Sequence, residues 1–413
     1  MRARTAALMF VSFVAAAPSW AASASPMVSG AAPAAPAVAA GAASSALSLI
    51  GLRPFTGPEN TRIVLAFSRS TAFVAPDSDR AMTLTITVPG EAVARAAEVP
   101  AMLRVRDGVV DSVEAATAVE GGRFRIWFHD STAFRVAGLP AEGDQPFRIV
   151  VDARRAGATQ ATERRLADIA RNKGRDRVRV VAVDAGHGGD DTGAHGPRSV
   201  RVLEKNVTLA VARALVDELN RTPGLRGELT RSGDYFVPLR ERYHLAEKMK
   251  ADLFVSIHAN SSRRRGSGSG TEVYFLSQRG ASDQADADFA NIENAADLVG
   301  GVPPQSEDGL VNILYDVKRS SALEQSQLLA ETVLDHVASD RRLESRGVKQ
   351  AGFVVLKSVE FPSILVETAF INNAVEARLL KNPEFQRQMA KQIAEGVRGY
   401  FARAGVAIGA RGD

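Results

Sequence analysis

Two histidines and a glutamate in the second half of the chain have the residue types that hold a catalytic metal ion. His187 and His258 each follow an apolar run that predicts a buried strand, at 178–183 and at 252–257. Because the carboxyl ends of strands in an open α/β sheet meet at one edge, we expect both imidazoles there. Glu204 begins the next predicted helix, a short loop after His187. Two imidazoles, one carboxylate and one open position are typical of a catalytic zinc site.

A hydrolytic zinc site also needs a group that takes a proton from water and returns it to the leaving amine. Bound Zn²⁺ lowers the pKa of its water to about 7, so hydroxide is present at neutral pH. Glu367 is the candidate base, because it follows the predicted strand 363–366 and so lies at a third strand end. Each of these residues alone has an ordinary structural explanation, such as a helix start or a strand-end cap. The predicted chemistry depends on their combination.

The elements that must position these residues alternate between strand and helix from residue 178 onward. This order predicts an α/β fold in which helices flank a mixed, largely parallel sheet, and we expect a catalytic domain over 177–405. The predicted strands are 178–183, 225–230, 252–257, 271–276, 352–356 and 363–366, and the predicted helices are 207–220, 239–250, 281–298, 320–339 and 383–402.

The preceding region, 47–155, has a different pattern of short apolar or alternating runs separated by Gly, Pro and Asp. Such runs predict a small all-β sandwich domain; they are 61–67, 82–88, 122–128 and 147–151. No acid/base pair or histidine cluster is found in this region, which favours a binding module over an enzyme. The Arg-rich segment 156–176 is interpreted as a basic linker, and attachment to an anionic polymer is the alternative.

The first residues have the pattern of an export signal. Arg2 and Arg4 precede the apolar run 6–17, and the small residues Ser19 and Ala21 fit a signal-peptidase site, so we expect a cleaved signal peptide at 1–21. The apolar run is too short to cross a bilayer, which needs about 20 residues. No other segment is long and apolar enough to span a membrane.

The composition limits the remaining choices. Segment 22–46, rich in Ala, Ser, Pro and Gly, is predicted to be a flexible linker. The chain has no cysteine, which excludes disulfides, thiolate catalysis and Cys-ligated zinc. Nucleic-acid binding is not expected, because the net charge is only +4 and no aromatic platform accompanies the basic stretch.

Five blocks of sequence, in order along 180–401, resemble the zinc-dependent N-acetylmuramoyl-L-alanine amidases of the type-3 class. They are VDAGHGG at 183–189, EKN at 204–206, Thr230 and Arg231 with Asp234, Leu239 and Arg242, SIHAN at 256–260, and PSILVETAFIN at 362–372. The resemblance implies Zn²⁺ on His187, Glu204 and His258, with Glu367 catalytic. Ala369 departs from the Gly that the family often has, and no catalytic consequence is expected.

The same resemblance implies a reaction and a location. The reaction would be hydrolysis of the amide between the lactyl group of N-acetylmuramic acid and L-alanine of peptidoglycan, during daughter-cell separation and wall remodelling. The location would be the periplasm. Region 47–155 is similar, in strand pattern and position, to the domain that precedes such amidases and binds the cell wall.

A long acidic insertion, 277–319, separates two predicted elements of the catalytic domain. Its segment 293–301, ENAADLVGG, resembles the helix that covers the zinc site of division-associated amidases until an activator removes it. This resemblance implies that Glu293 occupies the open zinc position and that a periplasmic activator displaces the 281–301 helix. The alternative is a surface helix with a solvated acidic face.

Two alternative functions remain at this point. A zinc peptidase would cleave within the stem peptide instead, and a non-catalytic protein would only bind the wall. The products of peptidoglycan digestion distinguish the three, because an amidase releases whole peptides from muramyl glycan and a peptidase leaves shortened peptides attached.

Overall fold

The computed structural model describes residues 46–141, 145–176, 178–262, 268–277, 280–302 and 313–408. The predicted signal peptide lies outside the described residues, as does all of the predicted 22–46 linker except Ala46. Among the helices of the described residues, none has both the length and the apolar character needed to cross a membrane.

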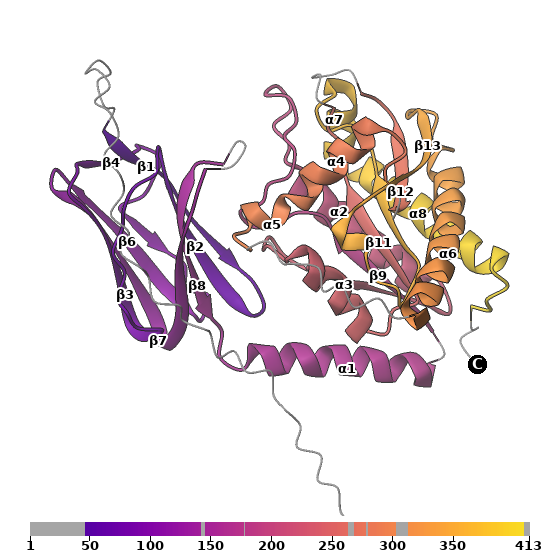
Figure 1. Ribbon diagram of the computed structural model, residues 1–413, viewed down its shortest axis with the longest axis horizontal. Helices are drawn as coiled ribbons and strands as arrows, with labels where there is room; N and C mark the ends of the chain where they lie inside the picture. Colours follow the sequence, from indigo (N-terminus) through magenta and orange to yellow (C-terminus); the bar gives the residue numbers. More distant parts are fainter. Residues whose placement is uncertain are drawn as a thin grey trace, which may run out of the picture. The chain divides into compact units, whose positions relative to one another are not determined.

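The N-terminal part of the described chain is built only of strands (Figure 1). They pair in the order β4-β1-β2-β8-β7-β6-β5, and β3 also pairs with β7. Their bounds are β1 Leu47–Thr56, β2 Asn60–Phe67, β3 Arg80–Pro89, β4 Val93–Arg95, β5 Met102–Arg104, β6 Val110–Ala118, β7 Gly121–Leu139 and β8 Phe147–Arg154.

Strand β7 joins two layers of this β region. Its first half pairs with β3 and β6, and its second half pairs with β8. Phe67 from one layer and Phe124 from the other meet edge to face, with ring centroids 5.6 Å apart. The four strands expected from the sequence are present, but β7 is far longer than expected, and β1, β4, β5 and β6 were not predicted because their apolar alternation is weak or short.

The C-terminal part contains a six-stranded sheet in the order β10-β9-β11-β14-β12-β13. All neighbouring strands in it are parallel except β12 and β14. The mixed, largely parallel sheet expected from the sequence is therefore confirmed. The strand bounds are β9 Arg179–Ala185, β10 Leu225–Leu229, β11 Leu253–His258, β12 Thr271–Leu276, β13 Ser345–Ala351 and β14 Ser363–Glu367.

Helices cover both faces of this sheet (Figure 1). Successive residues of β9 point to opposite faces, so Val181 and Val183 enter one core while Val180 and Ala182 enter the other. Helices α2 (Glu204–Arg221), α6 (Ile313–Val337) and α8 (Pro383–Arg403) pack on the first face. Helices α1 (Ala158–Asp176), α3 (Leu239–Lys248), α4 (Gln284–Asn294) and α5 (Ala296–Val299) contribute to the second, and a short helix, α7 (Ala374–Lys381), precedes α8.

The predicted strand 352–356 is wrong. The strand in this part of the chain is β13, which ends at Ala351, and Val354–Leu356 forms a 3₁₀ turn. Phe353, Val355 and Leu356 are buried against the second face of the sheet. A short apolar run shows that residues are buried but does not distinguish a strand from a buried turn.

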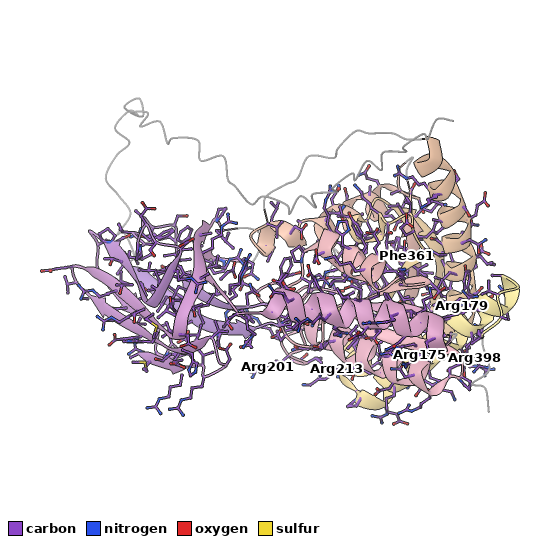
Figure 2. All side chains as sticks on the ribbon, turned by 90° about the horizontal axis from the view of Figure 1, so that it is seen from below. Arg175, Arg179, Arg201, Arg213, Phe361 and Arg398 are labelled. Atoms are coloured by element: carbon purple, nitrogen blue, oxygen red, sulfur yellow. The ribbon has the colours of Figure 1, made fainter. Side chains whose placement is uncertain are left out.

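The segment interpreted as a basic linker is mainly the 19-residue helix α1. Leu166 and Ile169 on one face of α1 are buried in the second core, which orders the helix. Its charged side chains form ion pairs: Arg165 with Glu228, Arg171 with Asp168, and Lys173 with Asp252. Figure 2 shows Arg175 close to the carboxyl end of α1.

Candidate metal centre and active site

Three adjacent strands bring the predicted chemistry to one edge of the sheet. Strands β9, β11 and β14 are neighbours and parallel, so their carboxyl ends coincide. His258 is the last residue of β11, Glu367 is the last of β14, and the two are register partners. His187 follows the end of β9 by two residues, and Glu204 is the first residue of α2.

Four of the five predicted site residues converge on one point. His187, Glu204, His258 and Glu293 each offer one ligand atom, and these atoms all lie within 4.8 Å of one another. Glu204 Oε1 lies 3.1 Å from His187 Nε2 and 3.2 Å from His258 Nδ1. The arrangement therefore contains two imidazole nitrogens and two carboxylates of the types that bind divalent metals.

The hydrogen bonding of the cluster fits a metal ion. Nε2 of His187 is buried and makes no hydrogen bond, although carboxylate oxygens lie close to it. A buried ring nitrogen left without a hydrogen bond is costly unless something else coordinates it. Glu204 accepts backbone N–H groups from Ala194 and Ala259 at 2.8 and 2.9 Å. These bonds hold the carboxylate in place before any ion binds.

The turn that carries His187 has an unusual backbone. His187 adopts φ +60°, which few non-glycine residues do. Its Nδ1 lies 2.8 Å from Oδ2 of Asp191, which orients the ring so that Nε2 faces the cluster. Sequence reasoning missed Asp191; the available signal was a carboxylate four residues after the histidine in a glycine-rich turn.

Cationic side chains hold the carbonyl oxygens of the same turn. Arg231 donates to the carbonyls of Ala185 and Gly186, both at 2.8 Å. Arg242 donates to those of Ala185 and His187 at 2.7 and 3.0 Å. Both arginines are almost completely buried. The sequence blocks pointed to these residues by resemblance alone, and the structure gives them a positioning role.

Gly186 is needed because the two histidine-bearing strands approach closely. A Cβ atom at Gly186 would lie 2.4 Å from Nε2 of His258, which is closer than any real Cβ contact. Any side chain at this position would push the His258 ring out of the cluster.

Glu367 is completely buried and neither of its carboxylate oxygens has a hydrogen-bond partner. Burial raises its pKa well above the usual value; His258 opposes this shift, and the nearby carboxylates Glu204 and Glu293 add to it. A divalent cation beside it would favour the ionised form again. The sheet thus places an unsatisfied carboxyl group next to the histidine cluster.

The histidine and glutamate ligand candidates form a set of opposite charges. Burial lowers the pKa of His187, but Asp191, Glu204 and Glu293 reverse this and hold the pKa well above its usual value. Burial raises the pKa of Glu204, and the two histidines outweigh that effect and lower it. The surrounding carboxylates therefore favour positive charge at the imidazoles. A bound metal cation would supply that charge in place of protons.

Helix α4 lies inside the acidic insertion and reaches the cluster. Oε2 of its Glu293 lies 3.3 Å from His187 Nε2 and 3.2 Å from His258 Nδ1. The side chain of the next residue, Asn294, donates to the carbonyl of Gly352 and accepts from the amide of Val354, both at 2.9 Å. The residue next to Glu293 therefore anchors the helix on the sheet domain by two hydrogen bonds.

The end of α5 is also held in place. Asp297 accepts the backbone N–H of Leu239 at 2.8 Å. The carbonyl of Val299 accepts from Arg148 at 2.8 Å, and that of Gly300 accepts from Arg62 at 2.5 Å. Positive side chains at the carboxyl end of a helix are favourable because they meet its unsatisfied carbonyls.

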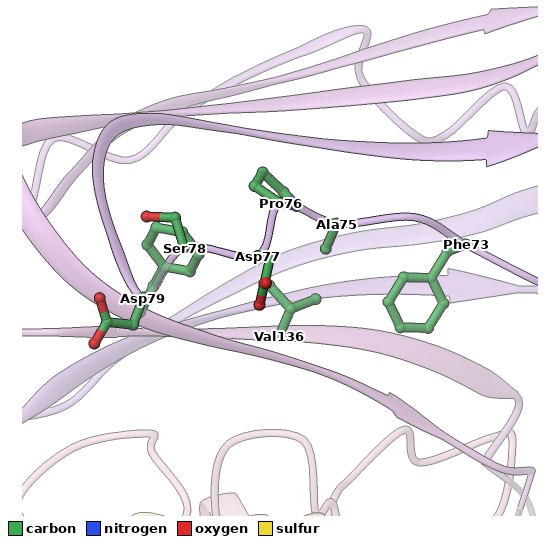
Figure 3. A pocket seen from close by; sticks show the side chains of 8 residues that line it. Phe73, Ala75, Pro76, Asp77, Ser78, Asp79 and Val136 are labelled. Carbon is green, nitrogen blue, oxygen red and sulfur yellow. The ribbon is translucent and has the colours of Figure 1, made fainter. Parts of the chain in front are cut away.

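A separate hollow of about 630 Å³ lies on the β region. Figure 3 shows Phe73 at one end of it, Asp79 at the other and Asp77 between them. No histidine lines it, so it does not share the chemistry of the metal-ligating cluster.

Comparison with known proteins identifies relatives of this sheet domain. Residues 181–399 match the family described as N-acetylmuramoyl-L-alanine amidase. The chain is 41% identical over 229 residues to N-acetylmuramoyl-L-alanine amidase AmiC of Escherichia coli O6:H1, covering 55% of this chain and 54% of that one. It is 43% identical over 224 residues to AmiA of Escherichia coli K12, covering 54% of this chain and 76% of AmiA.

The match thus spans about half the length of the AmiC relative. Among solved structures, AmiC2 of Nostoc punctiforme is similar, with 31% identity, a TM-score of 0.40, and coverage of 55% of this chain and 98% of that chain.

Proposed function

The chain belongs to the N-acetylmuramoyl-L-alanine amidase family, and on that basis we propose that it hydrolyses the amide between N-acetylmuramic acid and L-alanine in peptidoglycan. The observation that carries the proposal is the convergence of His187, Glu204, His258 and Glu293 at the carboxyl edge of the sheet. Glu367, beside His258, supplies the acid–base group that hydrolysis of an amide requires.

We assign the metal as zinc. His187 Nε2, a carboxylate oxygen of Glu204 and His258 Nδ1 would hold it, because these atoms converge and His187 Nε2 has no hydrogen-bond partner. Two imidazoles and one carboxylate, in a chain without cysteine, are a common catalytic zinc set. When bound, the ion would act as a Lewis acid toward the scissile carbonyl and toward water.

The protein's own groups then divide the remaining work. Glu367 accepts a proton from the attacking water and delivers it to the nitrogen of the leaving L-alanine. Asp191 keeps the His187 ring in one orientation and tautomer through its contact at Nδ1. Arg231 and Arg242 hold the 185–187 carbonyls, so the turn does not relax when substrate enters.

The covered state is autoinhibited in this proposal. Glu293 occupies the position that an attacking water or the scissile carbonyl must take, and the insertion 277–319 thus acts as a plug. A periplasmic activator would bind the state in which the 281–301 segment is displaced. Activation needs a partner that prefers the open state, because equal affinity for both states shifts nothing.

We assign the β region, 47–155, to cell-wall binding and segment 1–21 to export into the periplasm. The hollow with Phe73, Asp77 and Asp79 supports contact with glycan (Figure 3), since aromatic faces pack on sugar rings and carboxylates accept their hydroxyl groups. The position of this region before the sheet domain would bring the wall to the site during daughter-cell separation.

The deciding experiment is digestion of purified peptidoglycan by the full-length zinc-loaded protein with the plug opened by Glu293→Ala. The expected products are intact stem peptides with a free amino group on L-alanine and glycan strands that carry none. Shortened peptides still attached to glycan would show a peptidase instead. If the protein binds peptidoglycan and releases no soluble product, it is a non-catalytic wall-binding protein.

A further inference from the structure

Helix α4 presents a second buried carboxylate on the same side as Glu293. Asp286 precedes Glu293 by seven residues, which is almost two complete helical turns. Asp286 is 2% exposed and Glu293 is 9% exposed, and both are buried against the sheet domain. Their positions differ by about 10 Å along the helix axis. The plug therefore inserts two carboxylates into the sheet domain, and the metal-ligating cluster explains only one of them.

Asp286 meets a cation and a hydroxyl group that belong to the sheet. Its Oδ1 lies 3.0 Å from Nζ of Lys349 on β13 and 2.7 Å from the hydroxyl of Tyr274 on β12. Tyr274 and Lys349 are register partners in adjacent strands, so their positions are set by the sheet and not by the plug. Oδ2 of Asp286 has no hydrogen-bond partner. The Asp286 carboxylate thus uses only one of its two oxygens as a hydrogen-bond acceptor, as expected of a group that is displaced when the site opens.

This position is continuous with the active site. Glu272 on β12 is the register partner of Glu367 and lies on the same face of β12 as Tyr274, two residues further on. Its Oε2 lies 2.5 Å from the Tyr274 hydroxyl and 3.3 Å from Lys349 Nζ. A row of polar side chains therefore runs from His258 through Glu367 and Glu272 to Tyr274 and Lys349.

At the Lys349 end of this row, the charges balance only while α4 is in place. Two carboxylates, Glu272 and Asp286, face two cations, Lys349 and Arg346, and Arg346 also pairs with Glu272. Displacement of α4 removes one negative charge and leaves Glu272 shared between both cations. The Lys349 side chain is 19% exposed while α4 covers it. Displacement of α4 removes this cover together with the Asp286 charge, so the ammonium group becomes accessible and keeps only part of its counter-charge. The opened site therefore attracts an anionic group to the place that Asp286 vacates.

From this geometry, and on the premise of the proposed amidase function, we propose that Lys349 and Tyr274 form a subsite for a carboxylate of the substrate's stem peptide. Asp286 occupies this subsite in the covered state, as Glu293 occupies the metal position. An extended peptide advances 3.3–3.6 Å per residue, so about 10 Å corresponds to a carboxylate two or three residues beyond the scissile amide. The plug would thus imitate two ends of the substrate at once.

The test compares two synthetic muramoyl peptides that differ only in having a carboxylate or a carboxamide at the second and third residues. The full-length protein carries Glu293→Ala and Asp286→Ala, so that neither plug carboxylate competes. We expect a preference in kcat/KM of about 10- to 100-fold for the carboxylate substrate, as for a partly buried charged hydrogen bond. Lys349→Met should abolish that preference mainly through KM, and Lys349→Arg should restore part of it. Lys318→Met, which removes an exposed lysine paired with Glu360, should retain the full preference.

The outcomes separate the subsite from the amidase function. If neither peptide is cleaved by the opened protein, the amidase proposal fails. If both are cleaved with equal kcat/KM, or if Lys349→Met keeps the preference, the amidase stands and the subsite is wrong; Lys349 then only anchors α4. If the double variant does not fold, as judged by thermal melting, Glu293→Ala alone should show a smaller but measurable preference, and its absence would equally overturn the subsite.

Discussion

Glu293 and His187 face each other across the position that a catalytic metal would occupy, with Oε2 of the glutamate 3.3 Å from Nε2 of the histidine. They are more than a hundred residues apart in the chain, and Glu293 belongs to an insertion whereas His187 belongs to the first strand turn of the sheet domain. The same glutamate oxygen lies 3.2 Å from His258. A carboxylate so placed competes with any ligand that must enter.

Glu293→Ala is therefore expected to raise basal hydrolysis of peptidoglycan by about ten-fold or more without a partner, because it increases the fraction of competent protein. The measurement is the rate of dye release from labelled sacculi. Asp288→Ala is the matched control, since it removes an acid from the same helix that is not part of the metal-ligating cluster. Equal rates for the parent and Glu293→Ala would show that the helix does not inhibit the site and is only a surface helix with a solvated acidic face.

His258→Ala is expected to lose stoichiometric zinc and all hydrolysis, and His187→Ala likewise. Loss of a ligand that binds only the folded state also lowers the melting temperature in the presence of zinc. Metal analysis of the purified variants and thermal melting with and without chelator check both effects. His244→Ala removes an exposed histidine that pairs with Glu247 and should keep its zinc. Full occupancy in the two ligand variants would contradict the metal assignment.

Glu367→Gln is expected to bind zinc normally and to hydrolyse peptidoglycan about 10²- to 10⁴-fold more slowly, because the amide has the same shape but accepts no proton. The variant should also fold, since glutamine has the same shape and carries no charge, and the carboxyl group it replaces makes no hydrogen bond that would be lost. Parental activity in this variant would assign the proton transfer to another group.

Asp184→Asn is expected to destabilise the sheet domain by about 3–5 kcal/mol, because it leaves the buried Arg242 charge without its partner. Burial alone would raise the pKa of Asp184, but Arg242 and the hydroxyls of Thr230 and Ser256 outweigh it and lower the pKa. The ionised carboxylate therefore stabilises the fold above the unfolded pKa of about 3.9, and this contribution decreases as the pH falls through the lower folded pKa.

Denaturant unfolding at neutral and acidic pH measures the effect of Asp184→Asn, and the gap from the parent should narrow toward acidic pH. Asp335→Asn, in an exposed ion pair with Arg403, should cost less than about 1 kcal/mol at either pH. Equal losses for the two variants would show that the Asp184–Arg242 pair does not stabilise the fold.

The fragment 47–155 is expected to fold alone and to sediment with purified sacculi, since it contains its own hydrophobic core. Asp77→Ala with Asp79→Ala, which removes two carboxylates from the hollow, should weaken that sedimentation and leave the melting temperature unchanged. A fragment that folds but remains in the supernatant at low salt would refute wall binding by this region.

The sheet domain and the approximate location of its site could be predicted from sequence pattern. Buried parallel strands are continuous apolar runs, so the ends of 178–183, 252–257 and 363–366 could be found by pattern, and with them His187, His258 and Glu367. Because parallel strands share an edge, proximity of these residues followed without coordinates. The Arg-rich segment and the apolar run 352–356 were interpreted less well, since burial of a few residues does not specify helix, turn or strand.

The pairing of buried polar groups, by contrast, depends on how the sheet and its helices pack together. Chain folding brings Arg242 to Asp184 and Lys349 to Asp286, and no periodicity in the sequence encodes these pairs. The local sequence pattern predicts which side of a helix or strand is buried, because the apolar or polar character of each residue largely decides whether that residue is buried. The partner of a buried charge depends on distances between elements far apart in the chain, and these are fixed only when the sheet and its helices pack.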